Sequence, residues 1–386
     1  MSSTEAEATS TATAAITAAQ VVVPCTDLDE TIRFFTRTLG FRVDAIHPAD
    51  APSVAVLSGH GLQLRLDRHA SGSPGTLRVL CRDAVALASL ASLASLAGDG
   101  RAIVAPNGTV IELVDAAAGV VVPPVQQSLV ISRVEGSSEW KVGRAGMHYR
   151  DLIPDRQGGR FIASHIAIPD GGPVPDYVHF HKVRFQMIYC HRGWARLVYE
   201  DQGAPFVIET GDCVIQPPEI RHRVLEASPG LQVIEIGCPA EHETLADHAM
   251  ELPNSRVEPD RSFAGQRFVW HRAAVATWQP WRQAGFEHCD TGIARVTDGL
   301  AGVRTVRPTA TATAAISSSD DVVTPLSHDG EFAFLFVLDG AVTIAIDGRE
   351  PERLSTDDCI VIPAGLTHAL HEPTLDLRLL DVTLPG

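Results

Sequence analysis

Short apolar runs separated by turn residues make up most of the chain from residue 141 onward. The runs are rich in β-branched and aromatic side chains, and Gly, Pro or Asp bounds most of them. This pattern is typical of strands in small antiparallel barrels. The predicted strands are Phe161–Ile168, Phe185–Tyr189, Ala195–Tyr199, Phe206–Ile208, Cys213–Gln216, Leu231–Ile236, Ala333–Leu338, Ala341–Ile346, Cys359–Ile362 and Leu377–Val382.

The beginning of the chain shows a different pattern, in which strands alternate with helices. Asp27 or Thr26 can cap an amphipathic helix over Leu28–Leu39, and Gly40 ends it. A second helix is predicted over Val85–Ala97, after which Pro106-Asn107-Gly108 turns a hairpin. The strands expected around these helices are Ala19–Pro24, Phe41–Ile46, Ser53–Leu57, Leu62–Leu66, Thr76–Cys81, Ala102–Val104 and Thr109–Val114.

The later part of the chain repeats itself. Three landmarks return at offsets of 147, 147 and 146 residues, because His181, Gly193 and His222 recur as His328, Gly340 and His368. Near-constant offsets indicate a duplicated domain. We therefore divide the chain into a disordered tail (1–16), an α+β domain (17–115), a linker (116–140), a first barrel (141–240), a connecting segment (241–283) and a second barrel (284–386).

Composition narrows the range of partners. The 386 residues exceed what a single hydrophobic core normally organises. A net charge of −16 and a pI near 5.4, without a long cluster of Lys and Arg, argue against nucleic acid and favour small-molecule partners. The seven cysteines are scattered singly, so we expect reduced, buried thiols rather than a disulfide framework.

The first twenty residues lack the charged and apolar regions of a secretory signal, and no apolar run approaches the roughly eighteen residues of a membrane-spanning helix. These features predict a cytoplasmic protein without a membrane partner. Pairing of exposed strand edges would allow a homodimer.

Three histidines form the leading candidate site. Residues i and i+2 of a strand share a face, so His179 and His181 point the same way. His222 supplies a third imidazole from another strand. Three imidazoles suit a divalent transition metal. The simpler alternative is a set of hydrogen-bonded histidines inside a barrel.

The spacing around these histidines resembles the two-part signature of the cupin superfamily. The matching positions, in chain order, are His179, His181, Gly193, Gly211, Pro217 and His222. The resemblance implies a metal bound by His179, His181, Gln186 and His222, with Fe(II) favoured and Mn, Ni or Zn as alternatives. Gln186 stands where the family usually has Glu, and Glu219 where it has Gly, so the site loses one negative charge.

Four other residues near the ligand segments are candidates for substrate contacts or catalysis. Arg184 and Arg221 could pair with an anionic substrate, although arginines beside barrel strands often face solvent. Tyr177 shares the parity of His179 and His181. Glu219 could act as a base or orient an imidazole, and a plain turn residue is the simpler interpretation.

The duplicated motif makes the chain similar to the bicupins, and the second barrel has lost ligands. Its aligned positions are Leu326, His328, Ala333 and His368. We therefore expect a structural or vestigial site there. His371 or Glu331 could restore a site only if the backbone brought them to the two histidines.

Residues 22–41 and 106–113 resemble the vicinal oxygen chelate family, the glyoxalase and bleomycin-resistance proteins, whose modules are βαβββ. Only Glu112 matches a ligand position of that family, and Gln20 stands where a His is common. A structural or ligand-shaping domain is therefore favoured over a second metal site. The expected fold is mainly β: two tandem cupin barrels preceded by this α+β domain.

These features predict a metal-dependent cupin enzyme, with a non-haem Fe(II) dioxygenase acting on a small enolisable or aromatic acid as the leading hypothesis. A redox-neutral isomerase, lyase or decarboxylase is the second hypothesis. A non-catalytic small-molecule binding protein is the third.

Overall fold

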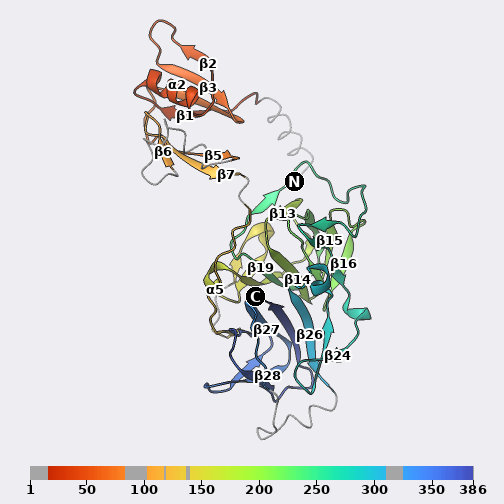
Figure 1. Ribbon diagram of the computed structural model, residues 1–386. Coiled ribbons are helices and arrows are strands. Elements are labelled where there is room, and N and C mark those ends of the chain that lie inside the picture. Colours follow the sequence, from red (N-terminus) through yellow and green to blue (C-terminus); the bar gives the residue numbers. More distant parts are fainter. Residues whose placement is uncertain (1–15, 83–101, 117–118, 136–139, 310–324, 386) are drawn as a thin grey trace. The chain divides into compact units, whose positions relative to one another are not determined.

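The computed structural model describes residues 16–82, 102–116, 119–135, 140–309 and 325–385 (Figure 1). The chain forms two compact units, residues 1–119 and 120–386. The predicted mainly β class is confirmed. Among the described residues, no helix is long and apolar enough to cross a membrane.

The first unit contains a four-stranded and a three-stranded sheet. The four-stranded sheet has the order β1-β4-β3-β2, with β1 (Val21–Pro24) parallel to β4 (Leu62–Asp67) and β3 (Val54–Gly59) antiparallel to β4 and to β2 (Arg42–His47). In the three-stranded sheet, β7 (Val110–Asp115) runs between β5 (Thr76–Cys81) and β6 (Ala102–Val104). The relation to the vicinal oxygen chelate fold stays a prediction.

The helix α2 (Leu28–Arg37) begins where the capping pattern predicted. The Asp27 side chain accepts a hydrogen bond from the Glu30 amide, which satisfies a helix N–H that otherwise lacks a partner. The helix ends at Arg37, two residues earlier than predicted. The predicted helix over Val85–Ala97 and the tail of residues 1–15 lie outside the described residues.

The second unit holds two β-barrels, each with a seven-stranded sheet. The first has the order β23-β17-β14-β19-β11-β10-β9, and the second has the order β8-β30-β27-β32-β26-β25-β24. The strands of the first sheet are β9 (Lys141–Val142), β10 (His148–Asp151), β11 (Ile162–Ile168), β14 (Phe185–Arg192), β17 (Cys213–Ile215), β19 (Leu231–Cys238) and β23 (Trp270–His271). Those of the second are β8 (Val130–Ser132), β24 (Gln279–Pro280), β25 (Phe286–Asp290), β26 (Gly302–Pro308), β27 (Phe332–Asp339), β30 (Cys359–Val361) and β32 (Arg378–Leu384). The two orders are equivalent strand for strand, in agreement with the repeated landmarks of the sequence.

A smaller sheet completes each barrel. In the first barrel it has the order β16-β15-β18-β13-β20, and β12 also pairs with β18. Its strands are β12 (Gly172–Pro173), β13 (His179–His181), β15 (Trp194–Tyr199), β16 (Phe206–Glu209), β18 (His222–Ala227) and β20 (Thr244–Ala246). In the second barrel, β28 (Ala341–Ile346) lies between β29 (Glu352–Ser355) and β31 (His368–His371). The remaining short elements are η1 (Arg144–Gly146), α5 (Arg156–Gly159), β21 (Ser262–Phe263), β22 (Gln266–Arg267), η2 (Ala273–Val275) and α6 (Ile293–Val296).

The two connecting segments contribute strands to the barrels. The segment 116–140 is more than a linker, because its strand β8 pairs with β30 of the second barrel. The connecting segment 241–283 supplies β20 and β23 to the first barrel. Each barrel therefore depends on chain that lies outside its predicted boundaries.

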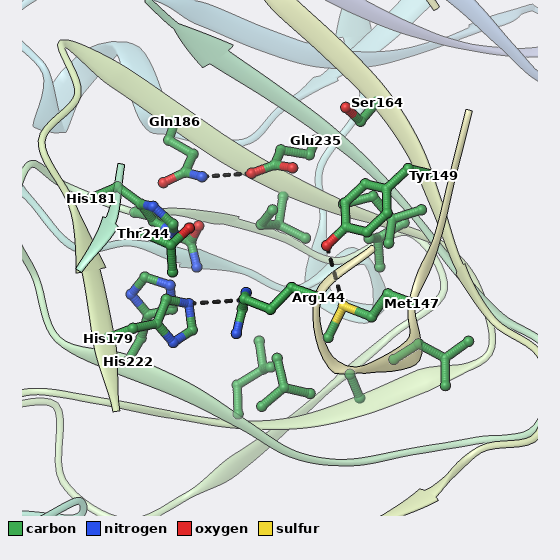
Figure 2. Close-up of a pocket in the computed structure, with 18 of the residues that line it drawn as sticks. Arg144, Met147, Tyr149, Ser164, His179, His181, Gln186, His222, Glu235 and Thr244 are labelled. Carbon is green, nitrogen blue, oxygen red and sulfur yellow. Dashed lines mark hydrogen bonds between the residues drawn. The ribbon is translucent and has the colours of Figure 1, made fainter. Parts of the chain in front are cut away.

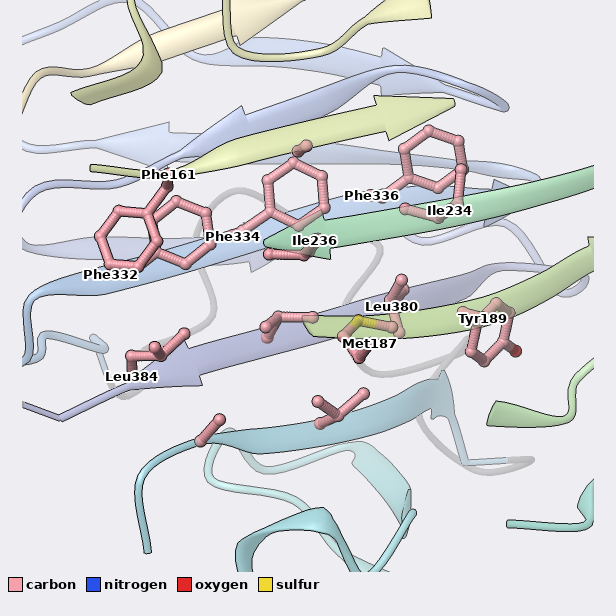
Figure 3. Close-up of a cluster of buried hydrophobic side chains, with 14 of the residues drawn as sticks. Phe161, Met187, Tyr189, Ile234, Ile236, Phe332, Phe334, Phe336, Leu380 and Leu384 are labelled. Carbon is pink, nitrogen blue, oxygen red and sulfur yellow. The ribbon is translucent and has the colours of Figure 1, made fainter. Parts of the chain in front are cut away.

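A large apolar core joins the two barrels (Figure 3). Phe185, Met187 and Tyr189 project from β14 into this core, and Phe334 and Phe336 project from β27. Alternate residues of a strand face opposite sides, so Gln186 and Ile188 face the inside of the first barrel, where both line a cavity. Both faces of β14 are buried, which explains its nearly continuous apolar sequence.

Candidate metal centre

Two neighbouring strands bring the three predicted imidazoles together. β13 pairs with β18 so that His179 lies directly opposite His222, and His181 follows on the same face of β13. One ring nitrogen from each of these histidines lies within 4.8 Å of the other two. All three residues are buried. The i, i+2 spacing therefore produced the arrangement that the strand geometry predicts.

Backbone carbonyl groups orient the three rings. Nδ1 of His179 lies 2.8 Å from the Tyr177 oxygen, Nδ1 of His181 lies 3.1 Å from the Glu243 oxygen, and Nδ1 of His222 lies 2.9 Å from the Ile220 oxygen. A carbonyl only accepts hydrogen bonds, so each Nδ1 carries the proton and each Nε2 keeps its lone pair. Histidine ligands of metals are commonly held in this way.

The surroundings keep these imidazoles neutral. The pKa of His181 is lowered to about 3, mainly by burial and also by the neighbouring His179 and His242. Burial also lowers the pKa of His222 well below its ordinary value. The pKa of His179 is lowered by burial and by the adjacent Arg144 cation. Neutral imidazole is the form that binds a metal ion.

Gln186 adds an oxygen to the same cavity, paired with an acid that the sequence did not reveal. Its Nε2 donates a 2.5 Å hydrogen bond to Oε1 of Glu235 on the neighbouring strand β19. Its Oε1 is buried and has no hydrogen-bond partner among the described residues. An unpaired buried carbonyl oxygen is costly, and a metal ion or a ligand donor would satisfy it.

Arg144 is the single arginine among the described residues that line this cavity, and Asp176 fixes its position. Its Nη1 forms an ion pair with the buried carboxylate of Asp176, which also accepts hydrogen bonds from the amides of Tyr177 and Val224. Its Nη2 lies 3.1 Å from Nε2 of His179. The guanidinium thus reaches the edge of the imidazole cluster (Figure 2).

The cavity itself has a volume of about 290 Å³. Its polar lining consists of the three histidines with Arg144, Ser164, Gln186, Tyr199, Gln216, Glu235, His242 and Thr244. The rest of the lining is mainly aliphatic, and Met147 and Tyr149 lie across the cavity from the histidines (Figure 2). Burial, together with the nearby Glu235 carboxylate, raises the pKa of the Tyr149 hydroxyl to about 12, so this hydroxyl stays protonated.

The structure places the predicted contact residues Arg184 and Arg221 outside the cavity lining. Arg184 lies directly before the first residue of β14, and its guanidinium group forms an ion pair with Glu331 of the second barrel. Arg221 pairs with Asp247 at 3.1 Å and lies over the Phe180 ring at 4.1 Å. Both guanidinium groups are thus committed to structural contacts.

Tyr177 and Glu219 also lie outside the cavity lining. Tyr177 is 39% exposed and touches the edge of His179, with ring centroids 5.9 Å apart. Glu219 is exposed and has a φ of 62°, the left-handed conformation for which the family pattern has Gly at this turn. Its amide donates to the His181 carbonyl, so the turn helps to hold the ligand strand.

Sequence reasoning missed Glu235 and Arg144. Glu235 lies in the apolar strand β19 between Ile234 and Ile236, and a single carboxylate in such a run is a detectable signal. Arg144 precedes two residues with positive φ, Ala145 and Gly146, at the start of the first barrel. Nothing in the sequence around Arg144 marks it as a cavity residue.

Among the described residues of the second barrel there is no comparable cluster of potential ligands. The bridge between Leu326 and His368 corresponds to the pair His179 and His222, so an apolar residue occupies one ligand position. Nε2 of His328 lies 2.7 Å from the Ile362 oxygen. Glu331 is engaged by Arg160 and Arg184.

A second histidine group lies where the barrels meet. His165, His191 and Asp357 place one potential ligand atom each within 4.8 Å of the others. Both nitrogens of His165 are engaged, with Nδ1 3.2 Å from the buried Arg150 and Nε2 3.0 Å from Gln232. His191 Nε2 lies 2.8 Å from Asp357. These contacts and the adjacent guanidinium favour a hydrogen-bonded network over a cation site.

Comparisons with known proteins identify part of the chain. Residues 317–383 match the family model of the cupin domain. No significant match was found among curated proteins.

Among solved structures, the chain is similar to a variant of oxalate decarboxylase from B. subtilis, with 11% identity and a TM-score of 0.49 over 70% of this chain and 80% of that one. It is also similar to HEPD from Streptomyces albus with 2-hydroxyethylphosphonate and Fe(II) bound (13% identity, TM-score 0.47, 68% and 78% of the two chains). A third similar structure is protein Ylba from E. coli (10% identity, TM-score 0.46, 69% and 94%).

Proposed function

We propose that this protein is a metal-dependent enzyme of the cupin class, built as a bicupin, whose first barrel binds a divalent metal and acts on a small anionic substrate. The observation that carries the proposal is the convergence of three neutral imidazoles whose Nδ1 atoms are all held by backbone carbonyl groups. Such a set leaves three lone pairs for one cation.

The residues present fit a metal ion. His179, His181 and His222 would hold it, and the unpaired Oε1 of Gln186 offers an oxygen in the same cavity. A bound divalent cation would supply Lewis-acid chemistry and, as Fe(II), the activation of O₂. We infer that Fe(II) is the working metal, because three imidazoles on one face would leave open positions for both O₂ and an anionic substrate; Mn, Ni and Zn are the alternatives.

The chain's own residues divide the remaining tasks. Glu235 holds the Gln186 amide in place, so that its oxygen stays directed away from β19. Arg144 offers guanidinium donors beside the histidines for an anionic group. The aliphatic wall excludes water from the rest of the cavity, which strengthens the electrostatic interactions inside it.

The leading reaction is dioxygenation of a small enolisable or aromatic acid. A redox-neutral isomerisation, lyase or decarboxylation reaction is the second candidate, and Glu235 favours it. A carboxylate that lines the cavity within reach of a bound substrate can accept or return a proton, which such reactions require.

Two measurements test the proposal. The purified protein should carry close to one metal ion per chain by elemental analysis, and the substitution His181→Ala should remove it. Oxygen uptake by the iron-loaded protein with small oxo, hydroxy and aromatic acids then identifies a dioxygenase. Turnover under nitrogen without oxygen uptake would select the redox-neutral reaction. Protein that carries no stoichiometric metal, and whose metal content and ligand affinity are unchanged by His181→Ala, would exclude both enzymatic functions and leave a binding protein.

A further inference from the structure

We infer that the substrate of the first barrel is a small monoanionic acid with an apolar body, and that Arg144 binds its anionic group. The inference rests on the proposed metal site and adds the substrate class and the residue that selects it. It follows from the order of polar and apolar residues along the cavity, from its charges and from the contacts of Arg144.

Strand register shows that polar and apolar lining residues are separated along the cavity. On the seven-stranded sheet, successive inward-facing pairs of β19 and β11 are Gly237 with Ile162, Glu235 with Ser164, Val233 with Ile166, and Leu231 with Ile168. On the facing sheet, Tyr199 lies opposite His222, and the next inward pair is Leu197 with Val224. Beyond Glu235 with Ser164 on one sheet and Tyr199 with His222 on the other, the inward pairs are apolar, so the polar lining gathers toward the histidine end of the cavity. A ligand with one polar end and an apolar body matches this order.

The size of the cavity limits that body. A volume of about 290 Å³ lies at the small end of the range of roughly 300–1,000 Å³ that is typical of ligand pockets. The apolar rows would leave hydroxyl or carboxylate groups at the far end of a ligand without hydrogen bonds. A second charged group is therefore disfavoured, whereas a branched aliphatic or compact aromatic body is favoured.

The charges around the histidines determine the charge of the ligand. Arg144 is neutralised by Asp176, whose side chain is fully buried. A divalent cation on neutral imidazoles would be opposed only by Glu235 among the described residues that line the cavity. The site would keep one positive charge, which a monoanion neutralises and a dianion would exceed.

Arg144 has donors available for that monoanion. Nη1 is taken by Asp176 and Nη2 by Nε2 of His179. The bond to His179 uses the same lone pair that a metal ion would use, so metal binding frees Nη2 beside the metal site. A guanidinium group held at one end and free at the other is suited to a carboxylate.

The test measures metal and ligand binding separately. Isothermal titration calorimetry on protein of known metal content uses four probes: 4-methyl-2-oxopentanoate, pyruvate, 2-oxoglutarate and the neutral 4-methyl-2-pentanone. We expect 4-methyl-2-oxopentanoate to bind at least tenfold more tightly than each of the others. Pyruvate lacks the apolar body, in which each buried methylene contributes about fourfold in affinity. The second probe acid, 2-oxoglutarate, carries a second charge, and 4-methyl-2-pentanone has no anionic group for Arg144.

Variants then locate the anion site. Arg144→Gln should weaken the binding of 4-methyl-2-oxopentanoate at least tenfold while metal affinity stays equal or rises, because the competing bond to His179 is lost. Arg144→Lys should restore part of the ligand affinity. Arg196→Gln is the matched control, since Arg196 pairs with Glu226 on the surface of the same barrel and should change neither affinity.

The outcomes separate this inference from the proposed function. Protein that binds no metal overturns both. Protein with stoichiometric metal that binds pyruvate or 2-oxoglutarate as tightly as 4-methyl-2-oxopentanoate overturns the substrate class alone. A loss of metal affinity in Arg144→Gln, with ligand affinity unchanged in the metal-loaded protein, would assign Arg144 to the metal site and overturn its role as the anion-binding residue.

Discussion

The charge of the site depends on two side chains, Gln186 and Glu235, which form a hydrogen-bonded pair. The cupin signature usually has Glu at the position of Gln186, and here a carboxylate lies one strand away instead, 2.5 Å from the Gln186 amide. A carboxylate at both positions would bring two like charges together, and one of them would retain a proton. The amide and the acid are therefore best understood as a matched pair.

Exchanging these two side chains tests that interpretation. Gln186→Glu alone should lower the free energy of unfolding of the metal-free protein by about 1–3 kcal/mol, because it replaces a hydrogen bond by repulsion. The double variant Gln186→Glu/Glu235→Gln keeps one amide and one carboxylate and should recover most of that loss. Urea denaturation of both variants, with and without metal, measures the effect. Additive losses in the double variant would show that the two residues are independent.

Buried histidines predict a pH dependence of stability. The pKa of His165 is lowered to about 4, mainly by burial and also by the adjacent Arg150 cation. The unfolded chain binds a proton at this residue near pH 6.5, whereas the folded chain does not until about pH 4. The stability due to the neutral ring is therefore complete above pH 6.5 and is lost as the pH falls toward 4, by about 1.4 kcal/mol per pH unit.

Denaturation of the metal-free protein at pH 7.5, 6 and 5 checks this expectation. His165→Gln removes the titrating group and should reduce the slope of stability against pH below 6.5. His69→Gln changes an exposed histidine of the first unit and should leave the slope as it is. An unchanged slope in His165→Gln would contradict the assignment.

At the scale of single elements, strands β14 and β27 show what the sequence could predict. Their apolar composition predicted two strands, which the structure contains with slightly wider bounds. Composition alone could not tell which face of each strand turns into a barrel, because both faces are buried. Arg184 lies just before β14, where alternation along the strand does not fix the direction of the side chain, and it pairs with Glu331 instead of facing the cavity.

One part of the candidate site was predictable from the sequence, and another part was not. The imidazoles of β13 follow from i, i+2 alternation within one strand, a local rule. Glu235 reaches the site because β19 pairs with β14, in a register that places Glu235 opposite Ile188. Register between strands forty residues apart is set by packing of the whole barrel, which no local pattern encodes.

The core between the barrels gives a prediction for β27. Phe334 is fully buried in this core, on the strand face away from the interior of its own barrel. Phe334→Ala should lower the free energy of unfolding by about 3–5 kcal/mol through lost burial and an added cavity. Phe334→Leu is the control and should cost clearly less. Metal content should stay the same in both folded variants, and a loss of metal would show that this core positions the ligand strands.

At the scale of the whole molecule, strands from outside the predicted boundaries of each barrel complete that barrel, so truncated chains can test where the domain boundaries lie. Residues 120–386 form a compact unit that includes β8, whereas a chain starting at residue 141 lacks it. Without β8, the edge of β30 loses its partner over Cys359–Val361, and Asp358 loses the hydrogen bond from the Val134 amide. Leu129 and Ile131, which pack against the core of the second barrel, are also lost.

We therefore expect the chain 120–386 to fold and to bind metal as the full-length protein does. The chain 141–386 should instead melt at least 5 °C lower, because losing an edge strand and two apolar side chains removes several kcal/mol, and about 1 kcal/mol shifts the melting temperature by roughly 2–4 °C in a domain of this size. Circular dichroism and elemental analysis of the two chains provide the comparison. Equal melting temperatures would mean that β8 is dispensable, and that the second barrel is complete within the boundaries that the sequence repeat predicts.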